Sequence, residues 1–137
     1  MSTSKPEPAQ ARSIRVSAAV IVNDRDELLL VRKAGTTAFM QPGGKPEPNE
    51  TPAETLSREL SEELGLSVDA ADLRPLGSFT AAAANEPGFL VVADVFEADI
   101  RDQRPVIAAE IEELRWVALA EADDLEVAPL AREYFLR

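Results

Sequence analysis

The stretch Gly44–Leu66 reads GKPEPNETPAETLSRELSEELGL, and it places reactive residue types at fixed spacing in a chain that offers no other obvious chemistry. Five residues separate Gly44 from Glu50, and seven more precede the run Arg58–Leu66, which reads R-E-L-S-E-E-L-G-L. The fixed positions comprise four glutamates, one arginine and two glycines. The probability that a chain of this length carries all of these residues at this spacing by chance is below about one in a million. The pattern is therefore specific enough to support an inference about function.

The same stretch carries the signals that begin and end a helix. Thr51 suits the N-cap and Pro52 the first helical position, and Glu54 follows Thr51 by three residues, which completes a capping box. Gly65 suits the left-handed cap at the other end. Between these caps, four apolar residues recur at about 100° per residue and predict a stripe that packs on a sheet: Ala53, Leu56, Leu60 and Leu64.

Three carboxylates share the helix face beside this stripe. Glu59, Glu62 and Glu63 are spaced i, i+3 and i+4, so a helix brings them together. Like charges at this distance repel, and each carboxylate alone favours its neutral form. Mg²⁺ and Mn²⁺ prefer oxygen ligands and reverse that balance. The spacing therefore predicts a metal site at the start of a diphosphate-binding cleft, where Arg58 can hold carboxylates by bidentate hydrogen bonds.

The fixed positions from Gly44 to Leu66 resemble the complete signature of the Nudix hydrolases: G, five residues, E, seven residues, then R-E-U-x-E-E-x-G-U with U aliphatic. This MutT-like resemblance implies an α+β fold, a helix–sheet–helix sandwich with a mixed β-sheet. It also implies an enzyme that uses Mg²⁺ (or Mn²⁺) to hydrolyse nucleoside diphosphates linked to another moiety X. A nucleotide-binding regulatory module without turnover is the alternative of a different class, although such modules usually carry a degraded signature.

The resemblance also implies roles for individual residues. Glu62 and Glu63 match positions that bind the metal directly, and Glu59 matches one that binds metal or activates water. Arg58 and Glu50 match the pair that orients this cluster. A glycine carbonyl next to the motif and a downstream glutamate complete the site in many relatives. The carbonyl candidates are Gly43 and Gly44, and the glutamate candidates, in order of preference, are Glu110, Glu113 and Glu86.

Composition narrows the remaining chemistry. Without cysteine there is no disulfide or thiolate nucleophile, and without histidine there is no Ser-His-Asp triad or imidazole ligand. In an enzyme of this composition, proton transfer falls mainly to carboxylates or to metal-bound water. Twenty-five acidic against 14 basic residues give a net charge of −11, which repels nucleic-acid backbones. A small-molecule nucleotide is therefore the expected partner, rather than DNA or RNA.

Length and hydropathy indicate a single domain. Residues 13–137 suffice for one hydrophobic core, and residues 1–12, which are polar and hold two prolines, predict a disordered tail. No apolar run approaches the roughly 20 residues that cross a membrane, and the tail lacks the apolar segment of a signal peptide. We therefore expect a cytoplasmic protein without a membrane partner. A homodimer, which is common among relatives, is left open.

Alternation and apolar runs predict the other elements. Strands are expected over residues 13–22 and 27–31, which look like a hairpin, and over 39–41, 73–80, 88–96 and 114–119. A loop over residues 81–88 could reach the site. A C-terminal helix is expected over 125–136, and its partly inward residues are Leu125, Leu130, Tyr134 and Phe135. Strands and helices mix without a regular βαβ repeat, which also favours the α+β class.

Two residues depart from common patterns of the family. Asn49 stands where glycine often precedes the motif's glutamate, and asparagine tolerates a left-handed backbone better than most residues. Gln41 stands before Pro42, where an apolar residue is usual. It is either a polar contact to substrate or a partly exposed loop residue.

The substrate pocket is less clearly marked than the motif. Arg32 and Lys33 close the second strand and could meet phosphates, with ordinary surface charge as the equal alternative. Phe39 could stack on a base, although an aromatic residue in a strand usually lies in the core. The small size and the lack of an added domain favour a nucleoside-triphosphate pyrophosphohydrolase. An ADP-ribose, nucleotide-sugar or dinucleoside-polyphosphate hydrolase is the close alternative.

Overall fold

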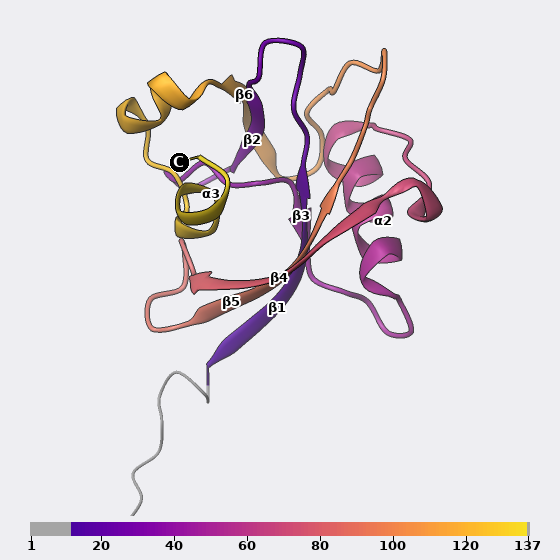
Figure 1. The fold of residues 1–137 in the computed structure, drawn as a ribbon. Helices are drawn as coiled ribbons and strands as arrows, with labels where there is room; N and C mark the ends of the chain where they lie inside the picture. Colours follow the sequence, from indigo (N-terminus) through magenta and orange to yellow (C-terminus); the bar gives the residue numbers. More distant parts are fainter. Residues whose placement is uncertain (1–11, 137) are drawn as a thin grey trace, which may run out of the picture.

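The computed structural model describes residues 12–136, so the tail expected over residues 1–12 lies, apart from Arg12, outside the described part of the chain. A four-stranded sheet has the order β3-β1-β5-β4. β1 (Ser13–Val20) runs parallel to β5 (Leu90–Glu97) and antiparallel to β3 (Gly43–Gly44). β4 (Arg74–Ala82) pairs antiparallel with β5 at the sheet edge (Figure 1). The predicted mixed sheet is confirmed.

The predicted hairpin between the first two strands is wrong except at its turn. Val22 and Leu28 form one antiparallel bridge, but the strands then separate into different sheets. β2 (Leu28–Lys33) pairs antiparallel with β6 (Ile111–Val117) instead. The reason is that both edges of β1 are already occupied, one by β3 and the other by β5. β6 also begins earlier than the strand expected over residues 114–119.

The helix α2 (Pro52–Leu64) covers one side of the strands, as the apolar stripe predicts (Figure 1). Leu56, Leu60 and Leu64 are fully buried, and Ala53 packs at the margin of the same cluster. Their partners are alternate residues of the first two strands and their neighbours: Ala19, Ile21, Leu29 and Val31. This side chain alternation fixes how α2 is rotated about its axis, and therefore where its polar face points.

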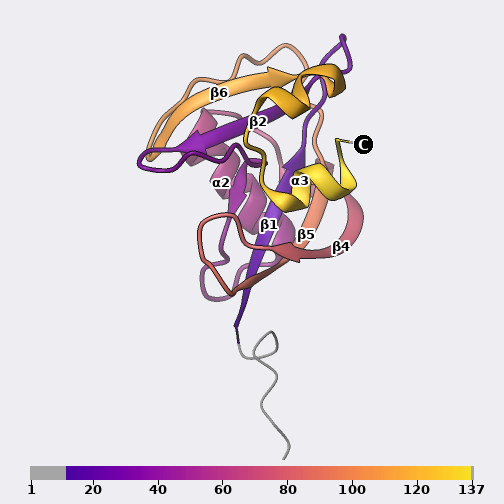
Figure 2. The same cartoon turned by 90° about the vertical axis from the view of Figure 1, so that its left-hand side faces the viewer.

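The intervening residues of the same strands face the C-terminal segment. Ala18, Val20, Leu28 and Leu30 share a second core cluster with Ala131 of α3 (Pro129–Tyr134). Figures 1 and 2 show α2 and α3 on opposite sides of β1. The class predicted from the sequence, α+β with helices on both sides of a mixed sheet, is confirmed.

The C-terminal helix expected over residues 125–136 is much shorter in the structure. A 3₁₀ helix η2 (Leu119–Asp124) precedes it, and residues 126–128 are extended because they pair with Phe39. The Phe39 amide donates to the Glu126 carbonyl, and the Ala128 amide donates to the Phe39 carbonyl, both at 2.8 Å. A helix can begin only after this bridge, where Pro129 suits its first position.

The other strand predictions hold with small shifts, except the one for residues 39–41, which do not form a strand. The strand expected over residues 39–41 is reduced to two isolated bridges, Val31 to Met40 and Phe39 to Val127. β4 and β5 match the strands expected over residues 73–80 and 88–96. A short 3₁₀ helix η1 (Ala70–Asp72) connects α2 to β4. Within the described residues, no helix combines the length and apolar character needed to cross a membrane.

Candidate functional site

α2 begins and ends where the sequence places its caps. The Thr51 hydroxyl accepts a hydrogen bond from the Glu54 amide (3.2 Å), and a Glu54 carboxylate oxygen accepts one from the Thr51 amide (2.9 Å). Pro52 is the first helical residue, and Gly65 ends the helix in the left-handed conformation with φ of 65°. With both ends fixed and the leucine stripe buried, the helix presents Glu59 to the β3 strand.

The two glycines of β3 allow the loop before α2 to approach its neighbours closely. A Cβ atom on Gly43 would overlap the Ser17 carbonyl oxygen, and one on Gly44 would overlap the Glu59 carboxylate. Only glycine lets the backbone pass between β1 and the helix at this separation. Asn49 adopts φ of 69°, so the left-handed turn expected at this departure from the family pattern is confirmed.

Arg58 joins the loop to the carboxylates of the helix. Its guanidinium donates two hydrogen bonds to Glu50, from Nε at 2.6 Å and from Nη2 at 3.0 Å. Nη1 donates to Glu59 at 3.1 Å and to Glu62 at 3.2 Å, and Nη2 also donates to the Lys45 carbonyl at 3.1 Å. One rigid cation therefore fixes three carboxylates and the loop backbone relative to one another.

Glu50, the loop residue that pairs with Arg58, is stabilised in its ionised form. The hydrogen bonds from Arg58, together with one from the Glu47 amide (2.8 Å), lower the pKa of Glu50 to about 2. The Thr55 hydroxyl donates a further hydrogen bond at 2.9 Å. Glu50 in turn raises the pKa of Arg58 above its already high value. Both residues are therefore charged at neutral pH, and together they form an ion pair.

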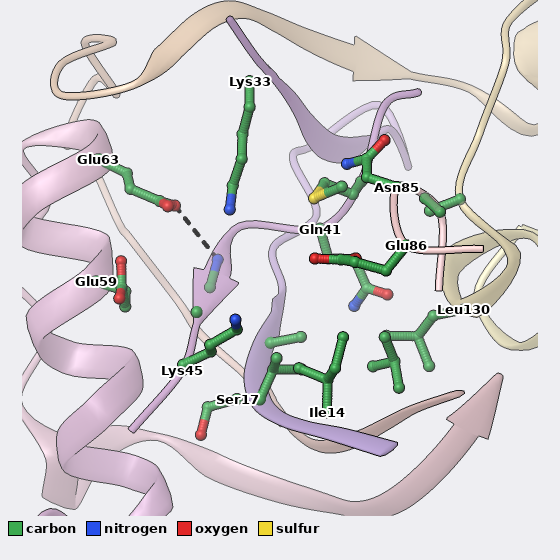
Figure 3. A pocket seen from close by; sticks show the side chains of 18 of the residues that line it. Ile14, Ser17, Lys33, Gln41, Lys45, Glu59, Glu63, Asn85, Glu86 and Leu130 are labelled. Atoms are coloured by element: carbon green, nitrogen blue, oxygen red, sulfur yellow. Dashed lines mark hydrogen bonds between the residues drawn. The ribbon is translucent and has the colours of Figure 1, made fainter. Parts of the chain in front are cut away.

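Glu63 has the opposite electrostatic character. It is 2% exposed, and burial, with a further contribution from the charge of Glu59, raises its pKa to about 8. The only hydrogen bond that its carboxylate accepts from the described residues is a long one from the Gly43 amide, at 3.4 Å (Figure 3). Burial also raises the pKa of Glu59. Two neighbouring carboxylates thus lack full compensation for the charge that they would carry at neutral pH.

Glu59 and Glu63 lie at one end of a cavity of about 480 Å³. This volume is within the usual range for a small-molecule site. One side of the cavity is charged, and we call it the charged half: Lys33, Lys45, Glu47, Arg58, Glu59, Glu63 and Glu110. The other side is mainly aliphatic, and we call its aliphatic residues the apolar half: Ile14, Val16, Ala18, Met40, Val91, Ala128, Leu130 and Ala131. Gln41, Asn85 and Glu86 also line this side (Figure 3). Figure 3 shows the Lys33 ammonium beside Glu63 and the Lys45 side chain extending into the cavity, away from Glu59.

The NUDIX domain family model matches residues 13–137 of the chain. The chain belongs to the Nudix hydrolase family. The RNA pyrophosphohydrolase of Halorhodospira halophila is 46% identical over 59 residues, which are 43% of this chain and 32% of that protein. The RNA pyrophosphohydrolase of Marinomonas sp. is 45% identical over 47 residues, or 34% of this chain and 29% of that protein. The match therefore spans about a third of these relatives.

Solved structures of the same family resemble the fold over most of its length. The MutT protein from Methanosarcina mazei superimposes with a TM-score of 0.72 at 26% identity, covering 91% of each chain. The MutT NUDIX hydrolase from Burkholderia pseudomallei gives a TM-score of 0.66 at 26% identity, covering 80% of this chain and 85% of that one. The recognition of the family from its signature is thus confirmed.

Several residues predicted for the site of this Nudix protein do line the cavity. Glu110 is one of them, and its carboxylate lies 3.8 Å from the Lys33 ammonium. The Glu110 carbonyl also accepts a hydrogen bond from the Ala34 amide at 2.8 Å, which ties this segment to the end of β2. Glu86 lies in the loop that was expected to reach the site, and it lines the cavity as well.

Arg32 and Glu113 do not line the cavity. The Arg32 guanidinium donates to Glu112 and Glu113 on β6 and to the Thr36 carbonyl. Hydrogen bonds from Arg115 and then from Arg32 lower the pKa of Glu113. Sequence neighbours in a strand point to opposite faces, so Lys33 reaches the cavity and Arg32 does not.

Phe39 and Glu62 are also placed away from the cavity lining. Phe39 is 6% exposed and packs in the same core cluster as Ala131 of α3. An aromatic residue in a strand usually lies in the core, so this was the alternative to base stacking. The Glu62 side chain is 53% exposed and ion-paired with Arg58. Gln41, in contrast, is buried and lines the cavity, so it is not a partly exposed loop residue.

Sequence reasoning missed most of the apolar half. Its residues come from β1, from β5 and from the C-terminal segment, as illustrated by Ile14, Val91 and Leu130. No local pattern distinguishes an aliphatic side chain that faces a ligand from one that faces the core. Lys45 was missed too, although its position directly after Gly44 was a usable signal, because the glycine backbone must approach the carboxylates.

The donor set of the charged half suits a divalent cation in part. Glu63 has no ion pair among the described residues, and a buried carboxylate of this kind is stabilised by a bound hard cation. Glu59 and the β3 backbone lie beside it. Over residues 12–136, however, no three acidic side chains converge as a ready-made metal site, because Glu62 is turned to Arg58.

Proposed function

We propose that this Nudix protein hydrolyses nucleoside diphosphates linked to another moiety X, and that nucleoside triphosphates are its preferred substrates. The observation that carries the proposal is one cavity that is lined by Glu59 and Glu63 and into which Lys33 and Lys45 extend their ammonium groups. Carboxylates suit a divalent metal, and ammonium groups suit phosphate oxygens. The names of the relatives, pyrophosphohydrolase and MutT, support the same reaction class.

Mg²⁺ or Mn²⁺ would be held by Glu59, Glu63 and a backbone carbonyl of Gly43 or Gly44. When bound, such an ion neutralises phosphate oxygens and lowers the pKa of a coordinated water. Glu62 matches a ligand position of the signature, and its carboxylate becomes available only if its 3.2 Å contact with Arg58 opens.

The other charged residues would position the phosphates and move a proton. Lys33 and Lys45 bind phosphate oxygens. Arg58 fixes the positions of the Glu50 and Glu59 carboxylates through its hydrogen bonds. Glu110 accepts the proton of the attacking water, since its carboxylate is at the cavity wall and 61% exposed, so the proton can pass on to solvent.

The size of the cavity supports a single nucleotide as the substrate. About 480 Å³ accommodates one nucleotide, with phosphates in the charged half and base and sugar in the apolar half. The net charge of −11 disfavours a longer nucleic acid. Because the named relatives are RNA pyrophosphohydrolases, RNA carrying a 5′-triphosphate is the alternative that must be tested directly.

The test is a substrate panel with purified protein in Mg²⁺ or Mn²⁺, with products resolved by chromatography. The panel contains canonical and oxidised nucleoside triphosphates, ADP-ribose, nucleotide sugars, dinucleoside polyphosphates and a 5′-triphosphorylated RNA. We expect metal-dependent cleavage of a nucleoside triphosphate that is lost in Glu63→Gln. Glu112→Gln is the matched control, because Glu112 lies on β6 outside the cavity.

Two outcomes would contradict the proposal. Preferential cleavage of RNA or of a sugar-linked diphosphate would show that nucleoside triphosphates are not the preferred substrates. Folded protein that binds metal and nucleotide but yields no product from any compound would instead support the non-catalytic binding module.

A further inference from the structure

The apolar half of the cavity presents aliphatic side chains directly beside the charged half, and we propose that it accepts a branched hydrocarbon chain. Diphosphate esters of aliphatic alcohols with about five to ten carbon atoms are then a second class of substrate, which a cavity of about 480 Å³ can hold. The inference rests on the proposed function in one respect, that the charged half binds and cleaves a diphosphate. It goes beyond that function, because the group attached to the diphosphate is not a nucleoside.

The alternation of side chains along β1 builds one wall of the apolar half. Ile14, Val16 and Ala18 lie at alternate positions of this strand, so their side chains share one face of the sheet. Val91 of β5 is the parallel neighbour of Ile14 and extends this wall. Figure 3 shows Leu130 of α3 and Ile14 extending towards the same space. The apolar half therefore lies between a sheet and a helix, with aliphatic side chains on both sides.

These aliphatic side chains differ from those of the core in their exposure. Ile14, Val16, Val91 and Leu130 are only partly buried, and the last three pack at the margin of the second core cluster. Apolar surface that is left in contact with water is stabilised when a hydrocarbon covers it, in proportion to the area covered. A contiguous surface of this kind inside a cavity therefore favours an apolar ligand group.

The cavity offers little that would hold a nucleobase by its face. None of the described residues that line it is aromatic. Stacking on aromatic rings supplies much of the affinity for bases in many proteins, whereas a hydrocarbon chain requires only close aliphatic contact. The lining of the cavity thus suits a hydrocarbon chain at least as well as it suits a base.

Three polar side chains on this side of the cavity are compatible with a hydrocarbon ligand. Gln41 is buried, and its amide nitrogen already donates to the Ala19 carbonyl at 3.0 Å. Asn85 and Glu86 are exposed on the loop after β4, so their polar atoms can stay hydrated while a chain fills the apolar half. The aliphatic residues provide the contacts to the chain, and these polar groups border them.

The reaction requires no reactant beyond those of the proposed function. The oxygen of a water molecule forms a bond to the β-phosphorus, and the bond from that phosphorus to the bridging oxygen breaks. The alkyl monophosphate leaves with the electron pair of the broken bond, and inorganic phosphate is released. The proton of the water passes to Glu110 and then to solvent.

The test compares methyl, isoamyl and tetrahydrogeranyl diphosphate in Mg²⁺, with a nucleoside triphosphate assayed in parallel. These saturated chains cannot ionise as allylic diphosphates do, so release of alkyl monophosphate and inorganic phosphate reports cleavage between the two phosphates. Each methylene group that is buried lowers KM, and we expect KM for tetrahydrogeranyl diphosphate to be about 30-fold or more below that for methyl diphosphate.

A polar substitution in the apolar half should reduce this advantage of the longer chain. In Leu130→Gln we expect the ratio of the two KM values to fall by about 5-fold or more. Leu119→Gln is the matched control, because Leu119 is 56% exposed and lies outside the cavity, so the ratio should be unchanged. A merely structural role for Leu130 would lower stability without changing the ratio. If Leu130→Gln does not fold, Ile14→Thr takes its place, since threonine keeps the β-branched shape that suits a strand.

Equal KM values for the three alkyl diphosphates, or a ratio that the substitution in the apolar half leaves unchanged, would overturn the inference. Cleavage of the nucleoside triphosphate without cleavage of any alkyl diphosphate would also overturn it, while leaving the proposed function intact. If neither class is cleaved, the proposed function fails, and calorimetry in Mg²⁺ decides whether the apolar half recognises the chain. Tetrahydrogeranyl diphosphate should then bind about 10-fold or more tightly than methyl diphosphate, and equal dissociation constants would overturn the assignment.

Discussion

The charged half and the apolar half of the cavity are assembled from the chain in opposite ways. Most of the charged half, including Lys45, Arg58, Glu59 and Glu63, comes from one continuous stretch, and a single capped helix and its preceding loop fix the relative positions of these residues. Lys33 and Glu110 are the two members that come from elsewhere in the chain. The apolar half draws on β1, β5, the segment around Met40 and the segment around α3. Chemistry encoded locally can be recognised from spacing, whereas a surface assembled from distant segments depends on the topology of the whole domain.

This contrast extends to the energetics of the two halves. Glu63 is buried and has no ion pair among the described residues, and its pKa is raised. The apolar half consists of ordinary aliphatic side chains that a ligand covers further. We therefore expect changes in the charged half to affect turnover and changes in the apolar half to affect substrate affinity.

The largest effect is expected at Glu63. Glu63→Gln should lower kcat by about 10²–10³-fold, because it removes a charge at the point where the phosphates are stabilised. Glu62→Gln should lower kcat less, since Glu62 is 53% exposed and paired with Arg58. Steady-state kinetics on the two variants provides the measurement. Equal losses would show that both carboxylates join the site in the working enzyme.

A second expected effect concerns stability and pH in the absence of metal. The folded protein holds the Glu63 proton up to a pKa of about 8, whereas an unfolded glutamate titrates near 4.5. The stability contributed by this group is therefore full below pH 4.5 and is lost as the pH rises from 4.5 to 8. In metal-free buffer, wild-type protein should lose about 5 °C or more in Tm relative to Glu63→Gln across this range.

Calorimetric scans of both proteins at several pH values measure this difference. Saturating Mg²⁺ should abolish it for the wild type, because the cation stabilises the ionised carboxylate. A Tm difference that does not change with pH would show that Glu63 is ionised in the folded protein already at low pH.

The smallest effect is expected in the apolar half. Leu130→Ala removes aliphatic surface from the cavity wall, and it should raise KM about 3- to 10-fold while leaving kcat nearly unchanged. Val106→Ala is a suitable control, since Val106 is 63% exposed and lies outside the cavity. A fall in kcat in Leu130→Ala, at saturating substrate, would mean that the apolar half also orients the reacting phosphate.

The accuracy of the sequence predictions follows the same division. α2 was predicted to its caps, because the capping box, Pro52 and Gly65 act within a few residues of one another. The hairpin and the long C-terminal helix were wrong because distant pairings decide them. β2 pairs with β6, and Phe39 pairs with the backbone around Val127.

Within the site, spacing predicted that Arg58 and Glu50 would pair, and they do. Spacing could not separate Glu62 from Glu63, because positions i+3 and i+4 both lie near Glu59 on a helix. The packing of the leucine stripe against β1 and β2 sets the rotation of α2, and this rotation buries Glu63 while leaving Glu62 exposed.

By itself, the sequence determined the family, the mixed α+β class, the capped helix and the pairing of Arg58 with Glu50. It could do so because these depend on interactions between residues close together in the chain. Only the tertiary structure decided which carboxylate is buried and that Lys33 rather than Arg32 faces the cavity. Burial and orientation depend on which distant segments meet, and the pairing of the strands and the packing of α2 and α3 settle that together.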